Sequence, residues 1–279
     1  MALFLQSDES PQAGGGNYFE NDPIIIRSST LGLLDFSNDV CYSGGTPIPA
    51  YANLLNLVYG GTNATNGPNA RVLETGMLKF TGSAPDTNDY VLLPTNEFTL
   101  PTTCKKSLVS VAVVLPASGY GTPAANRYPL FFGRLNNTSA ANVNFGIWGI
   151  VSTAGVLTSV QGASMGSVPV SATAQLALLT DGNKHVVSVY SDGETTAGTL
   201  VTRIYVDNIL VATATNNAWG GVVPQPTNLP RIGSYPATTH SPWGGMKVGR
   251  PLIMDLTGKT VNITDIIAQE VALTNEYLV

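Results

Sequence analysis

Charged side chains are scarce in this chain. Only 11% of its 279 residues are Asp, Glu, Lys or Arg, against roughly 25% in an ordinary soluble protein. The 13 basic residues are scattered and the formal net charge is −5, so no basic cluster exists to displace the counterions of a nucleic acid backbone. We therefore expect no nucleic-acid partner.

Long apolar runs and export signals are also missing. No segment approaches the roughly 20 apolar residues of a membrane span. The opening Met1–Leu5 is apolar but leads directly into Gln-Ser-Asp-Glu-Ser, with neither the basic region nor the longer apolar run of a secretory signal. These absences predict a chain made in a cytoplasm without a signal peptide and without a membrane span.

Cysteine and histidine occur only twice each. Cys41 and Cys104 cannot build a disulfide framework; we expect two buried free thiols, and the alternative is a bridge formed outside the cell. His185 and His240 have no cysteine or acid at ligand spacing, so a zinc site is not expected. Nucleophile-elbow and phosphate-loop motifs are absent as well.

In place of charged residues, the sequence is rich in alternating apolar residues and in residues that favour turns. Between Lys184 and Ala214, alternation places Val187 and Val189 on one face of a strand and Val186, Ser188 and Tyr190 on the other. Asp207-Asn208 stands where a two-residue hairpin turn requires positive φ. A second hairpin is expected from 145–151 and 156–160, and a turn at 181–183. Helical periodicity occurs only at 49–58 and in the tail after Thr264.

Several segments, in the correct order, resemble laminin-G-like, concanavalin A-like jelly rolls. They are Met77–Ser83 with Asp89–Pro94, Phe98–Leu100 with Leu108–Leu115, Lys184–Ala214, Arg231–Tyr235, Trp243–Gly249 and Asn262–Glu276. The resemblance implies an all-β fold, an antiparallel two-sheet jelly-roll sandwich over residues 28–279, preceded by an N-terminal arm over residues 1–27. We expect the following residues to be buried: Val187, Val189, Ile204, Val206, Leu210 and Phe80. Because both faces of the 186–189 strand are apolar, a loop or a subunit should cover its outer face. His185 should pack and hydrogen-bond at a strand end.

The jelly-roll fold serves lectins, glycosidases, adhesion modules and viral proteins, so activity must be argued from a site. Retaining glucanases of this fold carry an acidic Glu-x-Asp-x-Glu strand, because they need two carboxyls about 5 Å apart. This chain has no such strand, and Asp192 and Glu194 lie at a turn without a third acid. Catalytic residues are therefore not expected.

For contact with a sugar or a protein partner, the candidates are aromatic and amide side chains in loops. They are Trp219, Asn216, Asn217, Asn228, Tyr235, His240 and Trp243. Trp243 stands where the family buries an aromatic residue, which favours core packing for it. Trp219 has no such counterpart, and we expect it to be an exposed contact or part of a subunit interface.

Laminin-G-like domains often bind calcium at one rim, which makes Asp86, Asn88 and Asp89 the candidate ligands for a metal. The alternative is a turn that these side chains cap. No other cofactor is expected.

The N-terminal arm contains apolar residues that need a dry surface: Leu3, Phe4, Leu5, Ile24, Ile25 and Ile26. Three glycines at 14–16 make the arm flexible, so that it can extend to another surface. We expect the arm to add to the sheet edge of a neighbouring subunit; the alternative is that it folds back on its own sandwich.

These observations favour a non-enzymatic structural protein of a virion, such as a bacteriophage tail fibre, baseplate or capsid-decoration subunit. Its expected partners are other virion proteins, further copies of itself in a homo-oligomer, and a host surface glycan. One alternative is a carbohydrate-binding, lectin-like module. The other is a glycan-cleaving enzyme with a nonstandard site.

Overall fold

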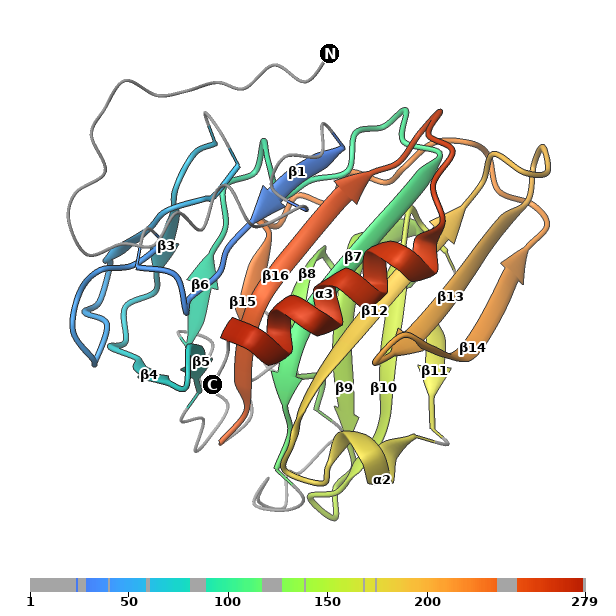
Figure 1. Cartoon of the computed structure of the whole chain (residues 1–279). Coiled ribbons are helices and arrows are strands. Elements are labelled where there is room, and N and C mark those ends of the chain that lie inside the picture. The colour runs from blue at the N-terminus through green and yellow to red at the C-terminus, as the bar shows by residue number, and fades with distance from the viewer. Residues whose placement is uncertain are drawn as a thin grey trace.

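A computed structural model describes residue 24 and residues 29–39, 41–58, 61–80, 89–116, 127–137, 139–167, 169–173, 175–234 and 245–277. In this part of the chain, two antiparallel sheets of eight strands each lie face to face (Figure 1). The predicted all-β, two-sheet antiparallel sandwich is therefore confirmed.

The first sheet has the strand order β14-β13-β12-β7-β16-β5-β4, and β1 also pairs with β16. Its central strands β7, β12 and β16 are nine residues long and buried along almost their whole length. The strands are β1 (Thr30–Leu33), β4 (Val72–Glu74), β5 (Met77–Lys79), β7 (Lys106–Val114), β12 (Lys184–Asp192), β13 (Leu200–Val206), β14 (Ile209–Asn216) and β16 (Lys247–Asp255).

The second sheet has the order β11-β10-β9-β8-β15-β6-β3-β2. The predicted hairpin around residues 152–155 is confirmed, because β9 and β10 pair across it. The strands are β2 (Asn53–Leu54), β3 (Ala64–Asn66), β6 (Tyr90–Leu92), β8 (Leu130–Leu135), β9 (Val143–Val151), β10 (Leu157–Ser164), β11 (Val170–Ala172) and β15 (Arg231–Gly233). A 3₁₀ turn, η1 (Ala140–Asn142), precedes β9, and a short helix, α2 (Leu176–Leu179), follows β11.

The core lies between the two sheets. Five of the six residues predicted to be buried have no exposed surface: Val187, Val189, Ile204, Val206 and Phe80. Leu210 is a wrong prediction, because its side chain is 50% exposed. It lies on β14, the outermost strand, where a register shift between Ile204 and Tyr205 interrupts the alternation on which the prediction relied.

The β13–β14 hairpin closes as predicted. Asp207 and Asn208 have φ values of 49° and 67°, as a two-residue type I′ turn requires. The Asp207 carboxylate also accepts a hydrogen bond from the backbone N of Val186 at 2.8 Å and lies 2.6 Å from Nδ1 of His185. Nε2 of His185 lies 3.1 Å from Asp181. The hydrogen-bonding role predicted for His185 at a strand end is confirmed.

The outer face of β12 is covered by helix α3 (Ile263–Tyr277), which lies across the first sheet (Figure 1). This confirms the helix predicted after Thr264, and it corrects the expectation that a loop or subunit covers this face. The guanidinium of Arg250, buried in β16, holds the helix: it donates to Glu270 at 3.1 and 3.0 Å and to Asp35 at 2.7 Å. Among the described helices, none is long and apolar enough to span a membrane.

The helix expected at 49–58 is wrong. Tyr51 has a φ of 58°, and the Nδ2 of Asn66 donates to the carbonyl of Pro49 at 2.7 Å. These features fold the segment into a turn that leads into β2, and a left-handed residue cannot continue a right-handed helix. Of the apolar residues whose spacing suggested a helix, Leu54 is buried, whereas Tyr51 and Leu55 are exposed.

Candidate functional site

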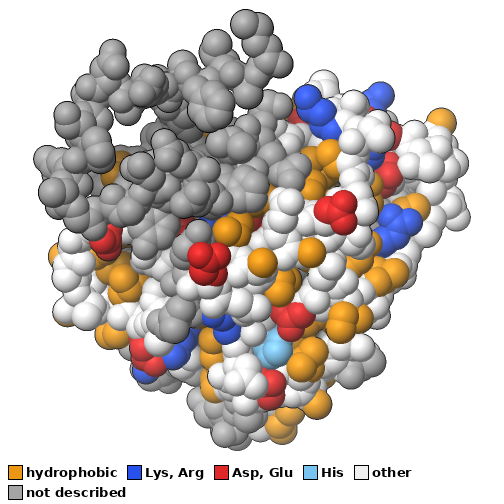
Figure 2. Space-filling view, viewed as in Figure 1, with side chains coloured by type: hydrophobic (Ala, Val, Ile, Leu, Met, Phe, Trp, Pro, Cys, Tyr) orange, Lys and Arg blue, Asp and Glu red, His pale blue; other side chains and the backbone are white. Residues whose placement is uncertain are grey.

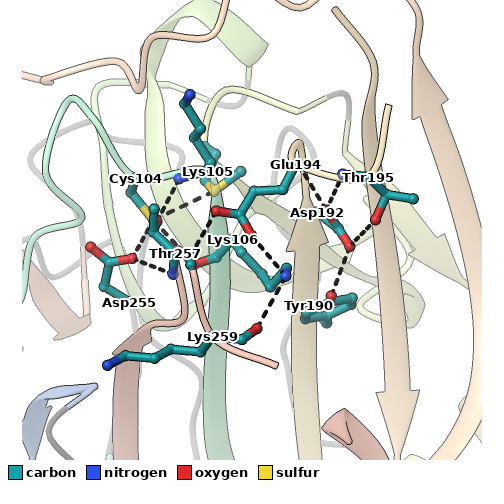
Figure 3. A network of polar contacts seen from close by, with 12 residues as sticks. Cys104, Lys105, Lys106, Tyr190, Asp192, Glu194, Thr195, Asp255, Thr257 and Lys259 are labelled. Carbon is teal, nitrogen blue, oxygen red and sulfur yellow. Dashed lines mark hydrogen bonds and ion pairs between the residues drawn. The ribbon is translucent and has the colours of Figure 1, made fainter. Parts of the chain in front are cut away.

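One rim of the sandwich carries a connected set of polar residues. Here β12 ends, β7 begins and β16 ends, as Figure 3 shows. Nζ of Lys106 lies 2.8 Å from Oε2 of Glu194, and Oε1 of Glu194 accepts from the backbone N of Gly258 at 2.7 Å. The backbone N of Lys105 donates to Oγ1 of Thr257 at 2.8 Å. These bonds tie three loops of the first sheet to one another.

Asp192 organises the loop that follows β12. Its Oδ1 accepts from the backbone N of Glu194 at 2.9 Å and of Thr195 at 3.1 Å. Its Oδ2 accepts from the hydroxyls of Thr195 at 2.8 Å and Tyr190 at 3.0 Å. Burial acts to raise the pKa of Asp192, but these hydrogen bonds outweigh it and hold the pKa below its ordinary value. The carboxylate is therefore a charged structural anchor for the loop.

A shallow hollow opens beside this loop on the outer face of β12 and β13. Val201 and Arg203 of β13 pair with Asp192 and Tyr190 of β12, so all four lie on the same face of the sheet. The guanidinium carbon of Arg203 lies 5.8 Å from the centre of the Tyr190 ring. No ion pair of Arg203 is present in the described part of the chain. The hollow is lined by Asp192, Thr195, Thr196, Thr199, Val201 and Arg203.

Trp219 is not the exposed contact that the sequence predicted. It is only 8% exposed, and its indole Nε1 donates to the carbonyl of Met165 at 3.1 Å. Its backbone N donates to the carbonyl of Gly198 at 3.0 Å, and a side-chain carbon at Gly193 would overlap its ring. Trp219 therefore holds the 193–198 loop, which bears two of the threonines of the hollow. The sequence could not show this, because the chain returns over the rim only in the folded structure.

Residues 217–230 form a crossing segment that carries the chain from β14 in the first sheet to β15 in the second. Backbone N of Val223 donates to the carbonyl of Thr102 at 3.1 Å, and Nδ2 of Asn144 donates to the carbonyl of Pro224 at 2.9 Å. Nη2 of Arg134 donates to the carbonyl of Pro226 at 2.9 Å. The crossing segment is thus bonded to β8 and β9 of the second sheet and to the loop that precedes β7.

The predicted amide contacts separate into two places. Asn216 ends β14 and Asn217 follows it, exposed, next to the start of β13 and hence to the hollow. Oδ1 of Asn216 accepts from the backbone N of Ala218 at 3.0 Å. Asn228 lies at the end of β8 instead, where its backbone N donates to Asn136 at 3.0 Å. Tyr235, His240 and Trp243 lie outside the described residues. Sequence reasoning missed Thr199 and Arg203, because the register that pairs Arg203 with Tyr190 is set in the folded sheet.

The calcium prediction rests mostly on residues outside the described part, since Asp86 and Asn88 lie there. Asp89 is described: it is buried, and its Oδ1 lies 2.6 Å from Nη2 of Arg71. The guanidinium carbon of Arg71 is in turn 5.2 Å from the centre of the Phe80 ring. Three acids, histidines or cysteines grouped to hold a metal do not occur among the described residues. The calcium site stays a prediction.

Both cysteines are buried free thiols, as predicted. Burial raises the pKa of Cys41 and of Cys104 to about 12. Sγ of Cys104 donates to the carbonyl of Lys106 at 3.3 Å and lies 3.4 Å from Asp255, whose negative charge also disfavours the thiolate. A thiol held protonated in this way is a poor nucleophile.

The N-terminal arm lies mostly outside the described residues, and with it Leu3, Phe4, Leu5, Ile25 and Ile26. Ile24 is described: it is fully buried in the chain's own core, and its carbonyl accepts from Oγ1 of Thr30 at 2.7 Å. At this position the arm packs on its own sandwich. Pairing of the remaining arm with a neighbouring subunit, and the boundary at residue 27, stay predictions.

No protein-family model matches the sequence, and no curated relative was found. Among solved structures, the chain is similar to the binding domain of Paraclostridial mosquitocidal protein 1, with a TM-score of 0.56 at 8% identity, over 87% of this chain and 52% of that one. It is also similar to the binding domain of botulinum neurotoxin serotype C1, with a TM-score of 0.52 at 14% identity, over 88% and 52%. A Trypanosoma rangeli sialidase matches with a TM-score of 0.48 at 13% identity, over 91% of this chain.

The chain spans about half the length of the two toxin domains and 34% of the sialidase. At these identities the likeness shows the fold alone. The two toxin binding domains give no support to the virion role predicted from the sequence, and the laminin-G relationship stays a prediction. The fold that these comparisons show is a β-sandwich of the kind found in toxin binding domains.

Proposed function

We propose that this chain is a lectin-like binding module and that the hollow beside β12 and β13 receives a carbohydrate. The observation that carries the proposal is the chemistry of the hollow's lining: three threonines, one carboxylate, one guanidinium and one small apolar side chain. Threonine hydroxyls both donate and accept hydrogen bonds, and a guanidinium offers five N–H donors. A sugar, which presents several hydroxyls and apolar C–H patches, matches this lining.

The walls of the hollow are fixed in advance, which favours binding. Asp192 receives four hydrogen bonds from the loop and from Tyr190. Trp219 holds the same loop from the other side through Gly198. A ligand therefore orders few groups when it binds, so little affinity is lost to conformational entropy.

The carboxylates next to the hollow support a binding role rather than a hydrolytic one. Burial acts to raise the pKa of both Asp192 and Glu194, yet hydrogen bonds from the loop to Asp192, and from Lys106 to Glu194, leave both values lowered. A glycosidase needs one carboxylic acid that remains protonated near neutral pH. Neither group meets this requirement, and we propose that the module is not an enzyme.

A glycan array with the purified chain tests the proposal, followed by affinity measurements on the strongest glycan. Replacement Thr199→Val keeps the shape and removes one hydroxyl, so we expect roughly tenfold weaker binding from one lost hydrogen bond. Arg203→Met should weaken binding by at least as much. Thr158→Val, at an exposed position of β10 in the other sheet, is the matched control and should bind as the wild type does. Absence of any glycan bound by the wild type, or unchanged affinity of both hollow variants, would refute the proposal.

A further inference from the structure

Strand β14 forms a long open edge of the first sheet. It pairs with β13 on one side, and no strand in the described part of the chain pairs with it on the other (Figure 1). Alternate residues of an edge strand direct their backbone N–H and C=O groups away from the sheet. Over eight residues, β14 therefore presents a row of hydrogen-bonding groups, and its side chains are at least partly exposed throughout.

This edge lacks the features that normally prevent pairing with another strand. Natural edge strands are short or carry charges, prolines or bulges. The opposite edge of the same sheet, β4, follows that rule: it has three residues, and Glu74 in it bonds Lys79 at 2.8 Å. By contrast β14 reads Ile-Leu-Val-Ala-Thr-Ala-Thr-Asn, without charge or proline, and a register shift occurs only near its start.

Two stretches of sequence near this edge carry no charge. The sequence has no Asp, Glu, Lys or Arg over residues 135–180 or over residues 208–230. The first stretch includes β9, β10 and β11, and the second includes β14 and the crossing segment. Strand β11 of the second sheet lies against β13 and β14, so the two uncharged stretches meet at this edge, and β13 contributes Arg203 opposite Thr213. In Figure 2, which has the same view as Figure 1, the right-hand side, where β14 runs, is mostly white and orange with a blue group among them.

We propose that β14 is a self-association surface, on which a second copy of this chain pairs its own β14 in antiparallel orientation. In antiparallel pairing about a twofold axis, residue i of one copy lies opposite residue j of the other, and residue j lies opposite residue i. The side chains that meet therefore all come from β14, and because β14 carries no charge, no like charges are brought together. The alternating threonines, Thr213 and Thr215, are also favourable residues for strands that pair.

Pairing through β14 also places two hollows on one continuous sheet face. Val201 and Arg203 lie on β13, directly next to β14, so the hollows of the two copies would be separated by only a few strands. This consequence rests on the proposed function, whereas the pairing does not. Two sites on one face would strengthen binding to a surface with repeated glycans, because the second contact is intramolecular.

Solution mass is the first test. Light scattering on the full chain should give twice the 29.2 kDa of one copy. Thr213→Lys places a like charge near its symmetry mate on an exposed position and should yield the monomer. Thr260→Lys, the same change in the exposed loop before α3, should remain dimeric. A monomeric wild type, or a Thr213→Lys variant that stays dimeric, overturns the proposal.

Cross-linking distinguishes this edge from other interfaces and does not require a destabilising charge. Both native cysteines are buried, so a cysteine introduced in β14 is the reactive thiol. Single-cysteine variants at each position from 210 to 216 locate the twofold axis, because only the residue on the axis lies opposite its own copy. Under mild oxidation at least one of these variants should form a covalent dimer, since opposed residues in paired strands approach within disulfide range. Thr158→Cys, on β10, should not. Failure of every variant from 210 to 216 refutes pairing through β14, and a glycan-array result leaves this test unaffected.

Discussion

A single carboxylate, that of Asp207, ties the turn between β13 and β14 to the start of β12. Its backbone adopts the positive φ of the turn, while its two oxygens bond the backbone N of Val186 and Nδ1 of His185. The hydrogen bond to Asp207, and to a lesser degree that to Asp181, raises the pKa of His185 above its ordinary value of 6.5, although burial opposes the shift. The protonated imidazole is thus favoured in the folded chain.

The raised pKa of His185 makes stability depend on pH in a defined direction. A group whose pKa is higher in the folded chain than in the unfolded chain stabilises the fold. This contribution is complete below the unfolded-state pKa and is lost as pH rises through the folded-state pKa. For His185 the pH range of this loss therefore begins near 6.5 and extends upward. We expect the free energy of unfolding to fall across this window in denaturant titrations. The His185→Gln variant should lack this decrease, and an equal slope in both proteins would contradict the assignment.

At the scale of elements, helix α3 covers the outer, apolar face of the first sheet at β12. Val186 and Tyr190 on the outer face of β12 are buried, and Figure 1 shows the helix lying over this region. The attachment is electrostatic as well as apolar, because Arg250 bonds Glu270 of the helix and Asp35 near β1. Both side chains of the Arg250–Glu270 pair are 1% exposed.

Removal of one partner from this buried pair should be costly. Glu270→Ala leaves the guanidinium of Arg250 with Asp35 alone in a dry environment, which destabilises a protein by about 3–5 kcal/mol. Chemical denaturation measures the loss. Glu276→Ala, on an exposed position of the same helix, removes the same charge and should change stability by less than about 0.5 kcal/mol. Equal effects of the two changes would show that Arg250 does not hold the helix.

At the scale of the whole molecule, stability comes from the sandwich core and from buried hydrogen-bonded groups, without a covalent cross-link. Cys41 and Cys104 are both free, and burial raises the pKa of each thiol to about 12. Cys104 instead packs with its Sγ 3.7 Å from Sδ of Met165. The thiols therefore behave as small core side chains.

This state of the cysteines predicts insensitivity to reductant. The melting temperature should be unchanged by an excess of dithiothreitol, and thiol reagents should label the chain only after denaturation. A drop in melting temperature on reduction would instead indicate a disulfide and contradict the free thiols. Cys104→Ser tests packing separately, because it places a more polar group in a buried site and should lower stability by about 1–3 kcal/mol.

The local features of this protein could be predicted from its amino-acid sequence. Period-2 alternation predicted the β12–β13–β14 strands, and Asp207-Asn208 predicted their turn, because strand pleat and positive φ are properties of neighbouring residues. The two-sheet sandwich followed from many such strands in a familiar order. The core prediction failed at Leu210, where an edge position and a register shift, neither visible in a local pattern, decide exposure.

Only the tertiary structure decided which distant residues meet. The sequence suggests that Trp219 is an aromatic residue in an exposed loop. In the folded chain, the crossing segment places it against Met165 and Gly198, where it is buried. Arg203 and Thr199 form a hollow because β12 and β13 share a face and the loop between them is held from both sides. The helix over the outer face and the open β14 edge likewise depend on strand order in the sheet. These are long-range contacts, and local residue preferences do not encode which partners a folded chain brings together.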